Sequence, residues 1–81
     1  MREMIDEEGA RWRVVAPRAV VAHGRQGAVL AFVPADRPDA EPLRTSVTFN
    51  SSEAAEAAIR TMGEKELRRR LTLARAALGT P

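Results

Sequence analysis

The sequence predicts an α+β fold: a three- or four-stranded antiparallel sheet, in the form of a meander, followed by two C-terminal helices packed on one of its faces. Two observations predict it. Before residue 50 apolar and polar residues alternate, which is the period of strands, and after it the apolar residues follow helical spacing. With 81 residues the chain forms one small domain. We place it at residues 11–81.

Residues 1–10 are acidic, end near Gly9 and show no regular apolar period. We interpret them as a flexible acidic N-terminal tail. The first strand is expected from Arg11, where Trp12, Val14 and Ala16 alternate with other residues. Pro17 interrupts this pattern, because proline cannot donate to a strand ladder. Residues 19–22 are then either a second short strand or the continuation of the first after a bulge.

Residues 23–27 contain two glycines between apolar runs, which is typical of a hairpin loop. Residues 28–33 are apolar on both faces and predict a central strand that is covered on at least one side. Residues 34–42 contain three prolines and three acids and are expected to form an extended loop. Residues 43–49 alternate cleanly and include β-branched residues, so they predict another strand.

The first helix is expected to begin at Asn50, because an N-cap residue followed by Glu53 forms a capping pair. Gly63 is expected to end it, since glycine accepts the left-handed conformation beyond a helix. The second helix is predicted from a core-facing stripe at helical spacing: Leu67, Leu71, Ala74 and Leu78. Gly79 and Pro81 are expected to end this helix.

Composition argues against several function classes. The chain has no cysteine, which excludes disulfides and thiolate metal sites, and its single histidine argues against a metal centre. His23 has no partner for a catalytic pair, because the serines fall at strand or cap positions. We therefore expect a protein that is not an enzyme and has no cofactor or metal. No apolar run is long enough to span a membrane and no signal core is present, so we expect no membrane partner and a cytoplasmic location.

Arginine supplies almost all of the positive charge, since Lys65 is the single lysine among 13 cationic residues and the net charge is +2. The triplet formed by Arg68, Arg69 and Arg70 is dispersed around the second helix, at about 100° per residue. Glu64 and Glu66 precede Arg68 and Arg70 by four positions, a favourable spacing for helix ion pairs. The triplet therefore indicates either a solvated helix face or a functional basic face.

Two arrangements of arginine suit phosphate. Arg68 and Arg75 lie close together on the second helix, near Thr72, and Arg11 and Arg13 project from one face of the first strand. Against nucleic-acid binding, all three aromatic residues resemble core residues rather than stacking platforms. Binding of a nucleic-acid backbone through Arg11, Arg13, Arg68 and Arg75 is therefore the alternative hypothesis.

The favoured hypothesis is a small, non-catalytic binding or regulatory module that engages a protein partner or a second copy of itself. Leu73 and Ala77 form a second apolar stripe on the second helix. This stripe either completes an intramolecular helix pair or forms a self-complementary patch for a two-fold dimer. The predicted binding surface combines the stripe with its basic rim: Arg68, Arg69, Thr72, Leu73, Arg75 and Ala77.

Overall fold

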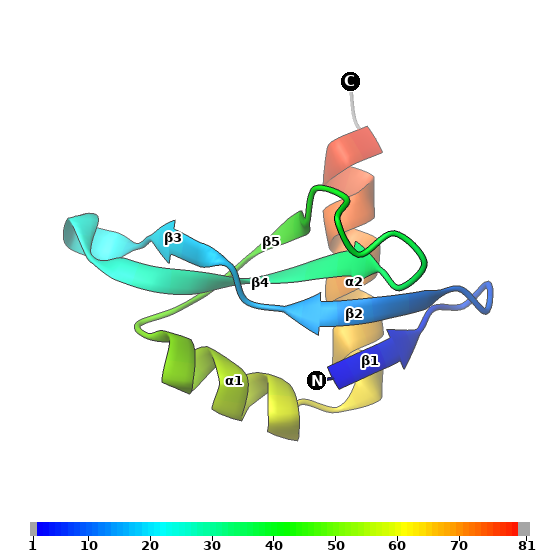
Figure 1. Ribbon diagram of the computed structural model, residues 1–81, viewed down its shortest axis with the longest axis horizontal. Helices are drawn as coiled ribbons and strands as arrows, with labels where there is room; N and C mark the ends of the chain where they lie inside the picture. The colour runs from blue at the N-terminus through cyan, green and yellow to red at the C-terminus, as the bar shows by residue number, and fades with distance from the viewer. Residues whose placement is uncertain (1, 80–81) are drawn as a thin grey trace.

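The computed structural model describes residues 2–79, with side chains as far as residue 77. A single antiparallel sheet lies against two helices (Figure 1), which confirms the predicted α+β fold of one small domain. The elements in chain order are β1 (Arg2–Ile5), β2 (Arg11–Val15), β3 (Arg18–Val20), a 3-10 turn (Ala22–Gly24), β4 (Gln26–Pro34), β5 (Leu43–Phe49), α1 (Ser52–Thr61) and α2 (Glu64–Gly79).

The long strand β4 is the centre of the sheet. One of its edges pairs with β5, and its other edge pairs with β3 along residues 26–28 and with β2 along residues 31–34. The two alternatives around Pro17 are thereby decided in favour of two short strands in line. Pro17 donates nothing to the sheet, but its carbonyl accepts the N–H of Val29 at 3.0 Å.

The N-terminal residues differ from the flexible tail that the sequence indicated. Residues 2–5 form β1, which pairs with β2 in a register that sets Met4 opposite Trp12. Met4 is only 2% exposed and belongs to the core. The hairpin forms because Asp6 and Gly9 provide the turn: the Asp6 carboxylate accepts two backbone N–H groups, and Gly9 adopts a φ of 87°. Residues from Arg2 onward therefore belong to the folded domain.

The hydrophobic core lies on the face of the sheet that both helices cover (Figure 1). Strand residues Leu30 and Phe32 meet helix residues Leu67 and Leu71 there, as the predicted stripe required. The full buried cluster is Met4, Val14, Leu30, Phe32, Ile59, Leu67 and Leu71. The predicted stripe member Leu78 lies outside the described side chains, and Pro81 lies outside the described residues.

Gly27 lies inside β4 rather than in the loop expected at residues 23–27. It is buried, and a Cβ atom there would meet the carbonyl oxygen of Phe49 and the side chain of Val21. The close approach of these neighbours therefore requires glycine, and the turn itself is made by His23 and Gly24, both of which have a positive φ.

The start of α1 differs from the prediction by one residue, and its end falls where it was predicted but has a different cause. Ser51, not Asn50, is the N-cap, since its hydroxyl accepts the N–H of Ala54 at 3.0 Å. The helix ends because Met62 is extended, with a ψ of 135°, and not through a left-handed Gly63. The carbonyl of Gly63 instead accepts the N–H of Leu67 and so starts α2.

Candidate functional site

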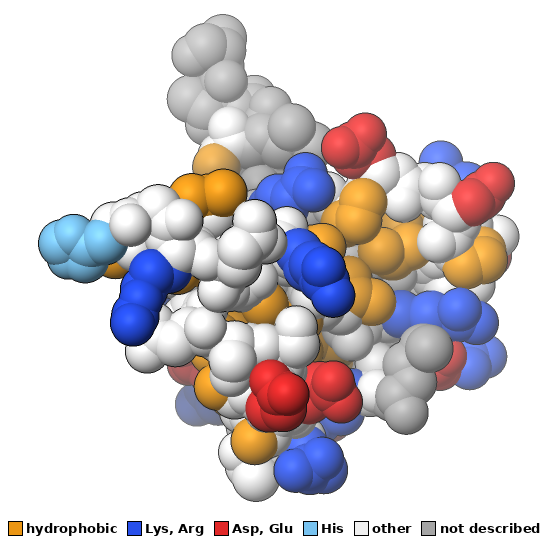
Figure 2. All heavy atoms as spheres, turned by 60° about the vertical axis from the view of Figure 1, so that its left-hand side comes forward, with side chains coloured by type: hydrophobic (Ala, Val, Ile, Leu, Met, Phe, Trp, Pro, Cys, Tyr) orange, Lys and Arg blue, Asp and Glu red, His pale blue; other side chains and the backbone are white. Residues whose placement is uncertain are grey.

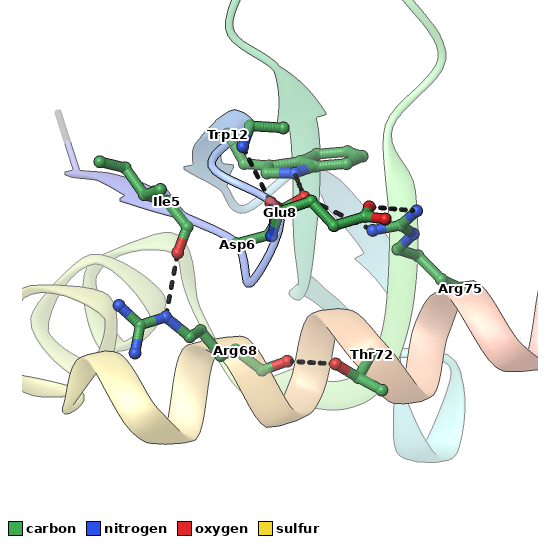
Figure 3. Close-up of polar contacts among 8 residues, drawn as sticks. Ile5, Asp6, Glu8, Trp12, Arg68, Thr72 and Arg75 are labelled. Atoms are coloured by element: carbon green, nitrogen blue, oxygen red, sulfur yellow. Dashed lines mark hydrogen bonds and ion pairs between the residues drawn. The ribbon is translucent and has the colours of Figure 1, made fainter.

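The basic residues predicted as a phosphate contact on α2 hold the β1–β2 hairpin in place (Figure 3). Arg68 Nε donates to the carbonyl of Ile5 at 3.0 Å, and its guanidinium lies 3.7 Å from Glu64. Arg75 reaches Asp6 at 3.5 Å and Glu8 at 3.8 Å. The hydroxyl of Thr72, between them, donates to the carbonyl of Arg68. An anion at this site would compete with carboxylates that are already there.

Asp6 organises this junction, and its side chain is only 8% exposed. Its Oδ1 accepts the backbone N–H groups of Glu8 and Ala10, and its Oδ2 accepts the indole N–H of Trp12 at 2.9 Å. The hydrogen bond from Trp12, followed by that from Ala10, lowers the pKa of Asp6. Arg75 also stacks over the Trp12 ring, 5.9 Å from its centroid. The junction is thus a satisfied structural network.

The remaining predicted residues of α2 point elsewhere. Arg69 and Arg70 share the carboxylate of Glu66, at 3.8 Å and 2.8 Å, so the expected ion pairs of this helix are present. Leu73 is 51% exposed and Ala77 is exposed too, beside an apolar groove that Pro42 and Leu43 line. Of the six predicted residues, Arg68 and Arg75 contact the hairpin, whereas Arg69, Leu73 and Ala77 are exposed on the neighbouring side of the helix.

The alternative nucleic-acid set is also divided. Strand register places Arg13 opposite Val33, on the face away from the helices, and Arg11 lies on the same face. Arg68 and Arg75 belong to α2, which covers the other face. The aromatic residues Trp12, Phe32 and Phe49 all pack in or against the core cluster. The structure therefore does not bring the four arginines together, and the aromatic residues are used in packing rather than as a stacking platform.

We call the face of the sheet away from the helices the open face. At its centre Val29, Ala31 and Val33 of β4 form a short aliphatic strip. All three are nearly buried although the helices lie on the other side, so side chains of the neighbouring strands shield them. The residues of the open face are Glu3, Ile5, Arg11, Arg13, Val15, Val29, Ala31, Val33, Arg44, Ser46 and Thr48.

Arginines flank this strip on both sides. On the β2 side, Arg11 and Arg13 share Glu3, at 2.8 Å and 3.7 Å. The hydrogen bond with Arg11 lowers the pKa of Glu3 and raises that of Arg11. On the β5 side, Arg44 lies 3.6 Å from the loop residue Glu41. Figure 2 shows basic side chains separated by hydrophobic and neutral ones, rather than one continuous basic patch.

The sequence contained part of this signal. It predicted that Arg11 and Arg13 share a strand face and that residues 28–33 are apolar on both sides. Nothing in the sequence alone showed that the helices would leave the second apolar side without a layer of its own. Sequence reasoning suggests Arg44 as a neighbour of Arg11 and Arg13, but it does not single out the other residues of β4 and β5 on this face: Val29, Ala31, Val33, Ser46 and Thr48.

Groups suited to metal binding are not gathered together in the part of the chain that the structure describes. No three acidic, histidine or cysteine side chains within residues 2–77 are placed to hold a metal ion. His23 is exposed in the turn before β4. Neither described helix has the length and apolar character needed to cross a membrane.

Comparison with known proteins adds no relative: no protein-family model matches the chain, and neither a curated protein nor a solved structure is similar to it.

Proposed function

We propose that this chain is a non-catalytic protein-binding module and that its binding surface is the open face of the sheet. The observation that carries the proposal is the composition of that face, where an aliphatic strip lies between arginines on a sheet that the helices cover on its other side only. Protein interfaces combine an apolar centre with a polar rim, and arginine is enriched in them.

The proposed surface has a fully paired strand at its centre and exposed polar side chains beside it. The strip belongs to β4, which is paired on both edges, and the core behind it holds Leu30 and Phe32 in place. Ser46 and Thr48 on β5 are exposed and flank the strip beside Arg44. A partner would thus contact a central strand that is paired on both edges, together with the exposed polar side chains beside it.

Self-association through the open face is disfavoured by its charge. Among its residues, three arginines stand against one glutamate, a sum of +2, and a face-to-face dimer would bring two such sums together. We therefore infer that the partner is a different protein. Sedimentation at high micromolar concentration checks this point. A dimer formed by the wild type but not by the open-face variant described below would contradict it.

The test is capture of proteins from a lysate of the source organism on the immobilised domain. The variant Ser46→Gln with Thr48→Gln fills the open face with longer neutral side chains and leaves the charge unchanged. Its matched control, Ser52→Gln with Thr61→Gln, makes the same change on α1. We expect the control to retain the proteins that the wild type retains, and the open-face variant to lose them. If both variants retained the same proteins, or if the wild type retained none, the proposed function would be wrong.

A further inference from the structure

We infer that the partner of the open face is an extended acidic protein segment with a carboxylate on each side of an aliphatic residue. This inference rests on the proposed function and adds the chemistry of the partner. It follows from the excess of arginine on the open face, from an unfilled donor on Arg13, and from the spacing of Arg13 and Arg44.

Arg13 is not fully used inside the domain. Its Nε is a buried side-chain nitrogen with no hydrogen-bond acceptor among the described residues, because the nearest carboxylate oxygen, on Glu3, is 3.7 Å away. Buried donors in native proteins normally have a partner. Glu3 meanwhile makes its short contact, 2.8 Å, with Arg11. One glutamate therefore serves two arginines and satisfies only one of them.

Arg44 is similarly available. Its side chain is 52% exposed, and its carboxylate neighbour Glu41 is a loop residue whose side chain is 86% exposed. An ion pair between two such exposed groups contributes little to stability. A carboxylate presented by a partner can therefore replace Glu41 at small cost.

The positions of the two arginines define the spacing of the acidic residues. Strands β2 and β5 lie on opposite sides of β4, so they are about 9.6 Å apart. Arg13 is opposite Val33 and Arg44 is opposite Ala31, which offsets them by about 6.8 Å along the strand. The two Cα atoms are then about 12 Å apart, close to the span of about 13.5 Å between residues i and i+4 of an extended chain.

Such a segment would cross the aliphatic strip. Residue i+2 points the same way as residues i and i+4, and it would meet Ala31 and Val33. Because Arg13 is opposite Val33 and Arg44 is opposite Ala31, we attribute part of the shielding of the strip to their long stems, as arginine stems cover apolar surface elsewhere. When their guanidinium groups turn to the carboxylates of the partner, the stems move aside and the strip is uncovered.

A protein segment fits this face better than a nucleic acid. Single-stranded nucleic acids bind through stacking on aromatic side chains, and the three aromatic residues of this chain pack in or against the core on the helix side. The strip is made of valine and alanine, which suit the packing of an aliphatic side chain.

The probe is a synthetic peptide of serine and threonine with a central valine and a glutamate two residues to either side. An isomer with the two glutamates adjacent at one end is the control, and a single-stranded oligonucleotide tests the phosphate alternative. Amide chemical shifts locate the binding, and titration at two salt concentrations gives the affinities. We expect shifts on β2, β4 and β5, weaker binding of the isomer, and an affinity that falls with salt.

Variants assign the contacts. Arg13→Gln and Arg44→Gln should each lower the affinity for the peptide about fivefold, whereas Arg69→Gln on the outer side of α2 should leave the affinity unchanged. Glu3→Gln removes the internal competitor and should tighten binding about two- to fivefold. A merely structural role for Glu3 would not produce this gain. Thermal melting confirms that each variant is folded.

Several results would overturn the inference: equal binding of peptide and isomer, shifts confined to α2, tighter binding of the oligonucleotide, or no binding at millimolar peptide. If the acidic peptide failed while lysate proteins were still lost on Ser46→Gln with Thr48→Gln, the partner chemistry would be wrong and the binding surface right. If both experiments failed, the proposed function would fall as well.

Discussion

Truncation of Met4 to alanine tests whether the N-terminal strand is part of the domain. Met4 is 2% exposed and contacts a cluster formed by Val14, Leu67 and other core residues. The substitution removes three heavy atoms from this site. At about 0.8 kcal/mol per buried methylene the transfer loss is about 2.4 kcal/mol. The cavity left behind adds to it, so we expect about 3 kcal/mol, within the range of about 2–5 kcal/mol for such truncations.

The adjacent residue offers a matched control. Ile5 follows Met4 in β1 but projects from the open face and is 47% exposed. Ile5→Ala should therefore cost about 1 kcal/mol or less. Urea denaturation followed by circular dichroism measures both free energies of unfolding, and thermal melting should show a loss of about 12–24 °C for Met4→Ala, at about 4–8 °C per kcal/mol.

The comparison has a clear negative outcome. If residues 2–5 were a free tail, neither substitution would change the free energy of unfolding. If they were a loosely attached strand, both substitutions would lower it slightly and by the same amount. If Met4→Ala and Ile5→Ala changed the free energy of unfolding by the same amount, the burial of Met4 against α2 would not hold in solution. The assignment of residues 2–5 to the domain would then be refuted.

Two further predictions concern the Asp6 network and Gly27. The pKa of Asp6 is lowered in the folded domain, chiefly by Trp12, so its contribution to stability is present above the unfolded pKa of about 3.9 and is lost as the pH falls through the lower folded value. The melting temperature of the wild type should therefore fall more steeply from about pH 5 to pH 2 than that of Asp6→Asn, and parallel profiles would contradict this role. Gly27→Ala places a Cβ against the Phe49 carbonyl and Val21 and should cost about 1–3 kcal/mol in urea denaturation. At Gly63 an added Cβ would meet nothing within 4 Å, so Gly63→Ala should stabilise the domain by about 0.4–1 kcal/mol. Equal changes in the free energy of unfolding for Gly27→Ala and Gly63→Ala would disprove the close approach at Gly27.

The parts of the fold that could be predicted from the sequence are those with a local cause. The alternation of residues 43–49 and the leucine stripe of α2 each carry a period that only one kind of element satisfies. The strand β1 has no such period in four residues, and its identity depends on pairing with β2 and on burial of Met4. The segment from Asp6 to Gly9 does contain turn residues, and these were the signal that could have revealed the hairpin.

Prediction of the candidate site was limited by tertiary contacts. Arg68 and Arg75 are close together on α2, as their spacing indicated, but the Ile5 carbonyl and the Asp6 carboxylate that they contact lie in the distant β1–β2 hairpin. The separation of 69 positions between Asp6 and Arg75 conceals such a pairing from any local pattern. The open face could not be predicted for the same reason. Residues 28–33 are apolar on both sides, so their sequence does not show which side of β4 the helices cover.

The contacts of α2 with the β1–β2 hairpin join two segments that lie far apart in the sequence, and the hairpin is synthesised well before the helix. Arg68 and Ile5 are 63 positions apart, and Arg75 and Asp6 are 69 positions apart. During translation the hairpin can form early, since its pairing is local, but Met4 stays without its helical cover until α2 leaves the ribosome. Completion of the core thus requires both β1 and α2, and a product released before α2 would expose part of the helix-facing side of the sheet.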